Sequence, residues 1–130
     1  MSDLEDIRPV GGLDAITIDC SNPLRLSRFW ADVLGTEIES AVGNPFHYVD
    51  LRPLPGVPIL RFQRVPEHKQ TKNRIHLDVS VENLDEAVAR VEALGGRLLS
   101  DHVFEEYEYR WIVMADLEDN EFCLVIRGTG

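Results

Sequence analysis

The sequence predicts an α+β fold built from two consecutive β-α-β-β-β units, whose two half-sheets form a cup with the helices outside. Three observations lead to this prediction. A strand-then-helix pattern occurs twice, two short segments repeat at a constant offset, and the first strand of each unit has one polar face. The repeated segments are "VLGTEIES" and "ALGGRLLS", which align with an offset of 60 residues, counted from Leu34 to Leu94.

The first unit opens with the alternating stretch "LDAITIDC" at residues 13–20. Alternation is typical of a half-buried strand, with Ile16, Ile18 and Cys20 on one face and Thr17 and Asp19 on the other.

A helix follows in "SNPLRLSRFWADVLG". Asn22 is a suitable N-cap, Pro23 a suitable first helical residue, and Gly35 a suitable end. Phe29 and Trp30 fall on the apolar stripe of this helix, and we expect both in the core.

The second unit repeats this order from "NRIHLDVS" at residues 73–80. Ile75, Leu77 and Val79 alternate there with polar residues, and Asn83 begins a helix that Gly95 and Gly96 end. Two strand-like runs then close each unit: "FHYVDL" and "PILRFQRV" in the first, "YRWIVMADL" and "EFCLVIRG" in the second.

These patterns predict one domain over residues 13–127, preceded by a flexible N-terminus at 1–12. The first module covers 13–64, a polar linker 65–73, and the second module 74–127.

Composition narrows the classes of partner. With 13 Lys and Arg against 23 Asp and Glu, the formal charge of −10 argues against nucleic acid and anionic membranes. No apolar run approaches the ~20 residues of a membrane helix, and the acidic start "MSDLEDIRPVGG" differs from an export signal. We therefore expect a cytoplasmic protein whose Cys20 and Cys123, far apart and without a CxxC spacing, are reduced thiols.

Three segments in order carry a family resemblance: "LDAITIDCSNPLRLSRFWADVLG", "NRIHLDVSVENLDEAVARVEALGG" and "WIVMADLEDNEFCLV". They resemble the vicinal-oxygen-chelate superfamily of glyoxalase I, bleomycin-resistance proteins and extradiol dioxygenases, and more closely its glyoxalase-like domain proteins. The last segment is similar to the superfamily's "DPxGN" turn and final strand. The resemblance implies the tandem fold and a homodimer, and leaves the activity open because this fold hosts many functions.

The resemblance also implies where a divalent metal would bind. Metal-holding members use a histidine in the first strand, a ligand in the last strand of the first half, a histidine opening the second half, and a glutamate in the final strand. These positions fall on Ala15, Leu60, His76 and Cys123. Because Ala15 and Leu60 cannot ligate, we expect no cofactor and no standard metal centre, with His76 and Cys123 as ligands if a divalent ion does bind.

The polar strand faces supply the candidate site. His76 is the candidate catalytic residue, since imidazole with an unperturbed pKa of ~6.5 can donate or accept a proton near neutrality. A simple hydrogen bond from His76 to Asp78 or to water is the alternative. The other candidate ligand-binding residues are Thr17, Asp19, Tyr48, Arg74, Asp78, Trp111 and Cys123.

Several of these candidates have a plain structural alternative. Tyr48 and Trp111 occupy equivalent places in the two halves and can be either core or an aromatic wall. Arg74 suits an anionic ligand group or simply a soluble linker, and Cys123 suits a buried thiol. We expect the acidic, aromatic stretch "FEEYEYR" to be a solvated loop or a lid.

Three functions remain in competition. The preferred one is a small-molecule-binding glyoxalase-like protein that holds an organic ligand in its cup and either sequesters it or transfers a proton through His76. The second is a metal-dependent lyase, isomerase or dioxygenase that uses His76 with nonstandard ligands. The third is a structural or regulatory partner domain without catalysis.

Overall fold

The computed structural model describes residues 8–128 and contains two helices and two sheets. The first module consists of β1 (Ala15–Cys20), α1 (Pro23–Leu34), β2 (Ile38–Val42), β3 (Tyr48–Leu51) and β4 (Ile59–Arg64). The second consists of β5 (Leu77–Ser80), α2 (Leu84–Ala93), β6 (Arg97–Leu98), β7 (Phe104–Glu106), β8 (Tyr109–Ala115) and β9 (Glu121–Arg127).

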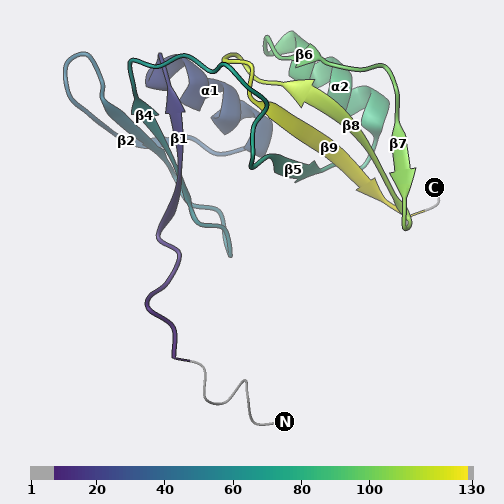
Figure 1. Cartoon of the computed structure of the whole chain (residues 1–130), viewed down its shortest axis with the longest axis horizontal. Coiled ribbons are helices and arrows are strands. Elements are labelled where there is room, and N and C mark those ends of the chain that lie inside the picture. Colours follow the sequence, from purple (N-terminus) through teal and green to yellow (C-terminus); the bar gives the residue numbers. More distant parts are fainter. Residues whose placement is uncertain (1–7, 129–130) are drawn as a thin grey trace.

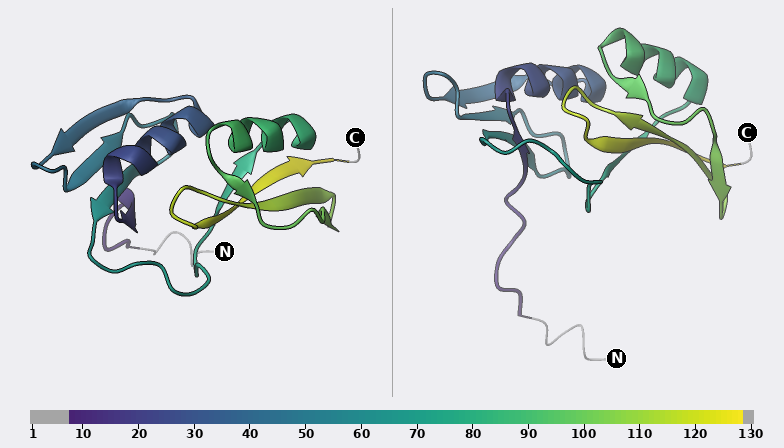
Figure 2. Two further views of the ribbon diagram at one scale, coloured as in Figure 1. Left: turned by 90° about the horizontal axis from the view of Figure 1, so that it is seen from above. Right: turned by 45° about the horizontal axis from the view of Figure 1, so that its top comes forward.

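The two sheets share one topology, which confirms the predicted α+β tandem repeat. Their strand orders are β1-β4-β3-β2 and β5-β9-β8-β6, with β7 paired to β8. In each sheet the first strand is parallel to the last strand of its module, and the other pairings are antiparallel. The helices lie next to each other on one side of the molecule, so both sheets turn their other face away from them (Figures 1 and 2).

The helices begin as their capping residues predict. Asn22 accepts a hydrogen bond from the backbone N–H of Arg25, and Asn83 accepts one from that of Glu86. Each bond satisfies a donor that the first helical turn would otherwise leave unpaired. Gly35 ends α1 with a φ of 71°, in the left-handed region where glycine carries no Cβ penalty.

One core joins the two modules behind the sheets. As predicted, Phe29 and Trp30 are buried, with 3% and 1% of their surface exposed. The Trp30 ring lies 4.8 Å from that of Phe122 in β9, and its Nε1–H donates to the carboxylate of Asp116 at 3.0 Å. Helix α1 of the first module therefore packs directly on the second module.

The predicted start of the second module's first strand is wrong. The strand predicted from Asn73 begins only at Leu77, and Ile75 is 77% exposed. The edge strand β5 pairs with β9 alone, and Glu121, where β9 begins, instead accepts a hydrogen bond from the backbone N–H of Asn73. The chain before Leu77 therefore has no strand to pair with.

The acidic stretch expected as a loop or lid is a hairpin of β7 and β8. Its two turn residues, Tyr107 and Glu108, both have positive φ, at 49° and 71°. Such turns usually carry Asn or Gly, so the sequence lacked the usual hairpin signature.

Along residues 8–128, neither helix is long and apolar enough to cross a membrane. The predicted flexible N-terminus lies in part outside the described residues, at 1–7; residues 8–14 precede β1 without regular structure.

Candidate functional site

The sheet register places the predicted polar residues on the faces turned away from the helices. In the first module Thr17 pairs with Arg61, and Asp19 with Gln63. Tyr48 pairs with Gln63 from the other side, so it belongs to the same face and is 38% exposed. The prediction of strand parity is thereby correct in this sheet.

An ion pair occupies the centre of the first module's polar face. Arg61 donates from Nε and Nη2 to the two carboxylate oxygens of Asp50, at 2.8 and 2.9 Å. Both side chains are partly shielded, and the hydrogen bond to Asp50 raises the pKa of Arg61 further above its usual value. The bidentate geometry holds this guanidinium in place and neutralises it.

The same register corrects the assignment of Leu60. Leu60 pairs with Ile16 on the helix side of the sheet and is 6% exposed, so it cannot face a ligand. Asp78 pairs with Cys123 just as Thr17 pairs with Arg61. The residue equivalent to Cys123 is therefore Arg61, one position further along, because the matching strands are offset by 62 rather than 63 residues.

Three predicted site residues of the second module come together on its polar face. His76 Nε2 lies 3.2 Å from Asp78 Oδ1, and potential ligand atoms of His76, Asp78 and Cys123 all lie within 4.8 Å of one another. His76 and Asp78 are 45% and 60% exposed at their side chains, whereas Cys123 is buried. We call these three residues the Asp78 triad.

The Cys123 thiol is protonated at neutral pH. Burial is the main cause that raises its pKa to about 11, and the charge and hydrogen bond of Asp78 raise it as well. The thiol consequently acts as a hydrogen-bond donor to Asp78 and not as a nucleophile.

An aromatic group lies on the same face, one row of residues away from the triad. Trp111 pairs with Val125 in β9 and with Phe104 in β7. The rings of Trp111 and Phe104 stack, with centroids 5.7 Å apart and planes inclined by 15°. Trp111 is thus part of a half-exposed aromatic wall and not of the core.

The remaining predicted residues meet at the junction of the two modules. Thr17, Asp19 and Arg74 help to line a cavity of about 270 Å³ between β1 and the start of β5 and β9. Glu121 closes one side; burial tends to raise its pKa, but hydrogen bonds from Asn73 and Lys69 outweigh this and lower it. The predicted site therefore divides into the junction cavity, the Asp78 triad with Trp111, and Tyr48 on the other sheet.

A family model described as "Glyoxalase-like domain" matches residues 15–125. The chain belongs to the glyoxalase-like domain family. A search of curated proteins finds no match to the sequence.

Solved structures of the vicinal-oxygen-chelate superfamily share the fold. A glyoxalase/bleomycin resistance protein/dioxygenase from Nocardioides superposes with a TM-score of 0.73 at 15% identity, covering 98% of this chain and 90% of its own. A family enzyme from Burkholderia phytofirmans PsJN has a TM-score of 0.69 at 20% identity, covering 90% and 99%. At these identities the likeness concerns the fold alone.

A third neighbour bears on the metal question. The fosfomycin resistance protein FosX from Listeria monocytogenes, as a mutant complexed with Mn(II) and 1S,2S-dihydroxypropylphosphonic acid, has a TM-score of 0.69 at 16% identity. It covers 94% of this glyoxalase-like chain and 93% of its own. Its ligand and metal are properties of that protein.

The residues of this family member fit a divalent metal only in part. The Asp78 triad offers one nitrogen, one oxygen and one sulfur, a mixed set that suits zinc better than magnesium or manganese. A metal would also have to displace the thiol proton that burial holds. The first module adds Arg61 and Ala15 at the related positions, and neither is a metal ligand.

Two features of the face were missed by reasoning from the sequence. Asp50 has a sequence signal, since it shares the strand parity of Tyr48, whereas the place of Arg61 follows from the register of β4 with β1 and β3. Phe104 has none, because its place depends on the β7–β8 hairpin.

Proposed function

We propose that this glyoxalase-like protein binds a small organic molecule on the open face of its second sheet, between the Asp78 triad and the Trp111–Phe104 wall. The observation that carries the proposal is the placement of both groups on neighbouring rows of one face. Cys123 and Val125 stand two residues apart in β9, about 6–7 Å, which is the width of a single ring. A ligand of that size would contact both groups at once.

The two groups offer complementary contacts. Trp111 presents an aromatic surface on which a planar group can stack, and Val113 and Val125 form an apolar floor beside it. Asp78 and His76 supply a hydrogen-bond acceptor and a donor–acceptor pair at the other end. Such a combination of apolar surface and a few polar groups is typical of small-molecule sites.

The triad also prepares His76 for proton transfer. When His76 Nε2–H donates to Asp78, the carboxylate holds that tautomer and leaves Nδ1 with a free lone pair. Nδ1 can then accept a proton from an acidic C–H or O–H group of the ligand, and Asp78 stabilises the imidazolium that forms. This step requires only residues of this chain.

A second copy of the chain would complete the site. The exposed faces carry several large apolar side chains, each at least 37% exposed: Val42, Tyr48, Leu99, Phe104 and Tyr109. Apolar surface of this kind is often covered by a partner. We therefore propose a homodimer in which the first-module face of one copy covers the second-module face of the other and adds Tyr48 to the ligand site.

A thermal-shift screen of small metabolites tests the proposal, because a ligand that binds only the folded state raises the melting temperature. Hits are repeated on His76→Ala and on His68→Ala, an exposed histidine of the linker. A site at the triad predicts that the first substitution abolishes the shift and the second leaves it intact. Equal shifts in both variants would place the ligand elsewhere.

The triad also supports a second candidate function, a zinc-dependent lyase, isomerase or dioxygenase. Metal analysis of protein purified without a tag or chelator decides between the two. One equivalent of zinc that is lost in both His76→Ala and Cys123→Ser would favour the metalloenzyme and overturn the metal-free proposal.

A further inference from the structure

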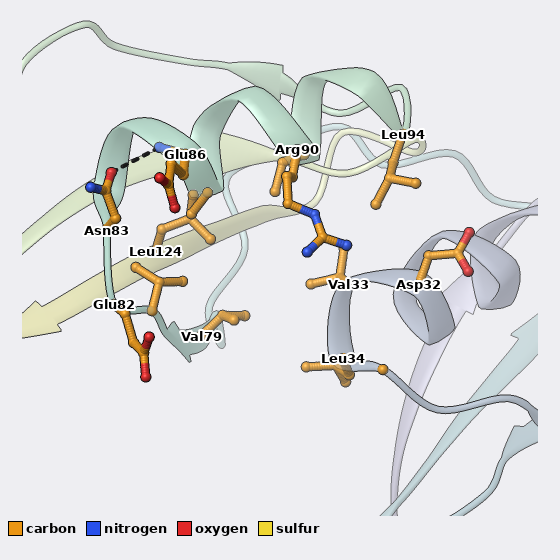
Figure 3. Close-up of a pocket in the computed structure, with 14 residues that line it drawn as sticks. Asp32, Val33, Leu34, Val79, Glu82, Asn83, Glu86, Arg90, Leu94 and Leu124 are labelled. Atoms are coloured by element: carbon orange, nitrogen blue, oxygen red, sulfur yellow. Dashed lines mark hydrogen bonds between the residues drawn. The ribbon is translucent and has the colours of Figure 1, made fainter.

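A second hollow lies on the helix side of the molecule, away from His76 and Asp78. It has a volume of about 400 Å³, runs along α2 from Asn83 to Leu94, and is bounded on its other side by the end of α1 (Figure 3). We call it the helical groove. Nothing in the proposed function uses it.

The floor and walls of the helical groove are apolar and come from both modules. Val79, Val81 and Leu124 form the floor, Ala87 and Val91 one wall, and Val33 and Leu34 the other. Only Val91 and Leu124 are buried, at 4% and 1% exposure; the other five are half-buried. The core therefore leaves usable apolar surface in the groove, which a bound apolar group would remove from water.

Charged side chains surround this surface unevenly. Glu82 and Glu86 stand at the end where α2 begins, and Arg90 reaches from α2 toward the end of α1, where Asp32 lies (Figure 3). Across residues 8–128, none of the four side chains forms an ion pair. The α2 end thus carries two unpaired carboxylates.

The helix dipoles do not cancel this negative charge. The N-terminus of α2 contributes about half a positive charge near Glu82 and Glu86, and the C-terminus of α1 about half a negative charge at the opposite end. The two carboxylate charges of Glu82 and Glu86 exceed the half positive charge at the N-terminus of α2. The net charge of −10 on the whole chain adds a further field that attracts cations.

We propose that the helical groove binds an organic ammonium ion with a compact apolar body. The ammonium group is held by Glu82 and Glu86, and the apolar body covers Ala87, Val81 and Leu124. This site is independent of the Asp78 triad, because alternation along β5 and β9 turns Val79 and Leu124 to the opposite side of the sheet from Asp78 and Cys123.

Three matched probes test the charge that the groove selects. Cyclohexylmethylamine, cyclohexylmethanol and cyclohexanecarboxylate share one ring and differ in charge, and each is titrated into ¹⁵N-labelled protein. We expect saturable shifts of the backbone amides at 33–35 and 81–87, with an affinity for the amine in the roughly millimolar range set by its few heavy atoms. The alcohol should bind more weakly, and the carboxylate most weakly.

Charge variants test the sign of the effect. Glu86→Gln should weaken binding of the amine roughly three- to tenfold, as expected for one charge several ångströms away near a protein surface. Arg90→Gln should strengthen it, and Glu92→Gln, on α2 outside the groove, should leave it unchanged. Equal binding of the three probes, or an effect of Arg90→Gln in the opposite direction, would overturn the proposal.

A variant that fills the helical groove tests whether the amine binds there. Ala87→Leu puts three extra carbons into the groove, whereas Ala89→Leu adds them to an exposed position of the same helix. Loss of amine binding in the first and retention in the second is expected. Retention in both, or amide shifts centred on Trp111 and Cys123, would show that the amine binds elsewhere and would refute the groove site.

Discussion

Replacing Trp30 should show how much its hydrogen bond to Asp116, which joins the two modules, contributes to the free energy of unfolding. Trp30 is 1% exposed, and its Nε1–H donates to Asp116 Oδ2 at 3.0 Å. Asp116 is itself 3% exposed and also accepts from the backbone N–H groups of Glu118 and Asn120 and from the Asn120 side chain. The carboxylate therefore ties α1 to the turn that leads into β9.

The expected cost follows from these contacts. A hydrogen bond to a charged group contributes about 1.5–3 kcal/mol, and the space left by the smaller ring adds about 1 kcal/mol. Trp30→Phe should thus lower the free energy of unfolding by about 2.5–4 kcal/mol. Asp116→Asn should be similarly costly, because its amide N–H₂ would face the donors of Trp30 and Asn120.

A double-mutant cycle isolates the indole–carboxylate pair. Urea unfolding followed by circular dichroism gives the free energies of the wild type, Trp30→Phe, Asp116→Asn and the double variant. We expect a coupling of about 1.5–3 kcal/mol, with unchanged m-values. A coupling below about 0.5 kcal/mol would mean that the turn alone holds Asp116, and the proposed tie between modules would be refuted.

Other substitutions test smaller parts of the structure. Burial, and secondarily Glu118, raises the pKa of the Cys20 thiol from 9.0 to about 12. The folded state therefore keeps this proton when the unfolded chain has lost it, so stability is complete below pH 9 and falls by about 1.4 kcal/mol per pH unit above it. Unfolding at about pH 8 and about pH 10.5 should show about 2 kcal/mol more loss in the wild type than in Cys20→Ala, and parallel losses would contradict the assignment. Gly96→Ala places a Cβ 2.6 Å from Val91 Cγ1 and 3.1 Å from the Ala115 carbonyl oxygen. This substitution should lower the free energy of unfolding in urea by about 1–3 kcal/mol, whereas Gly12→Ala, with open space around it, should be neutral. If Gly96→Ala is also neutral, then α2 can move aside to admit the extra methyl group. Asn22→Ala removes the cap of α1 and should cost about 1 kcal/mol, measured as a lower melting temperature, with an unchanged value arguing that Pro23 alone starts the helix.

Much of the fold could be predicted because its signals are local. Alternation assigned Thr17, Asp19 and Asp78 to the polar faces of their strands, the family resemblance pointed to Cys123, and the caps at Asn22 and Asn83 marked both helix starts. These patterns act over a few residues, so the amino acids themselves carry them.

The candidate site was harder to predict because it depends on register between distant strands. A shift of one residue between β4 and β9 exchanged Leu60 for Arg61 as the partner position of Cys123, and such a shift turns every side chain to the other face. The stacking of Phe104 on Trp111 likewise required a hairpin whose turn residues, Tyr107 and Glu108, give no hairpin signal.

The sequence by itself determined the family, the repeated strand and helix pattern, and the core positions of Phe29 and Trp30, and it singled out His76 as a candidate. Only the tertiary structure decided which of the polar residues meet. In the tertiary structure His76 lies beside Asp78 and Cys123, Arg74 lines the junction cavity together with Thr17, and a groove lies between the helices. The reason is physical: strand parity is a property of the local backbone, whereas distances between side chains depend on pairing and packing that join residues far apart in the chain.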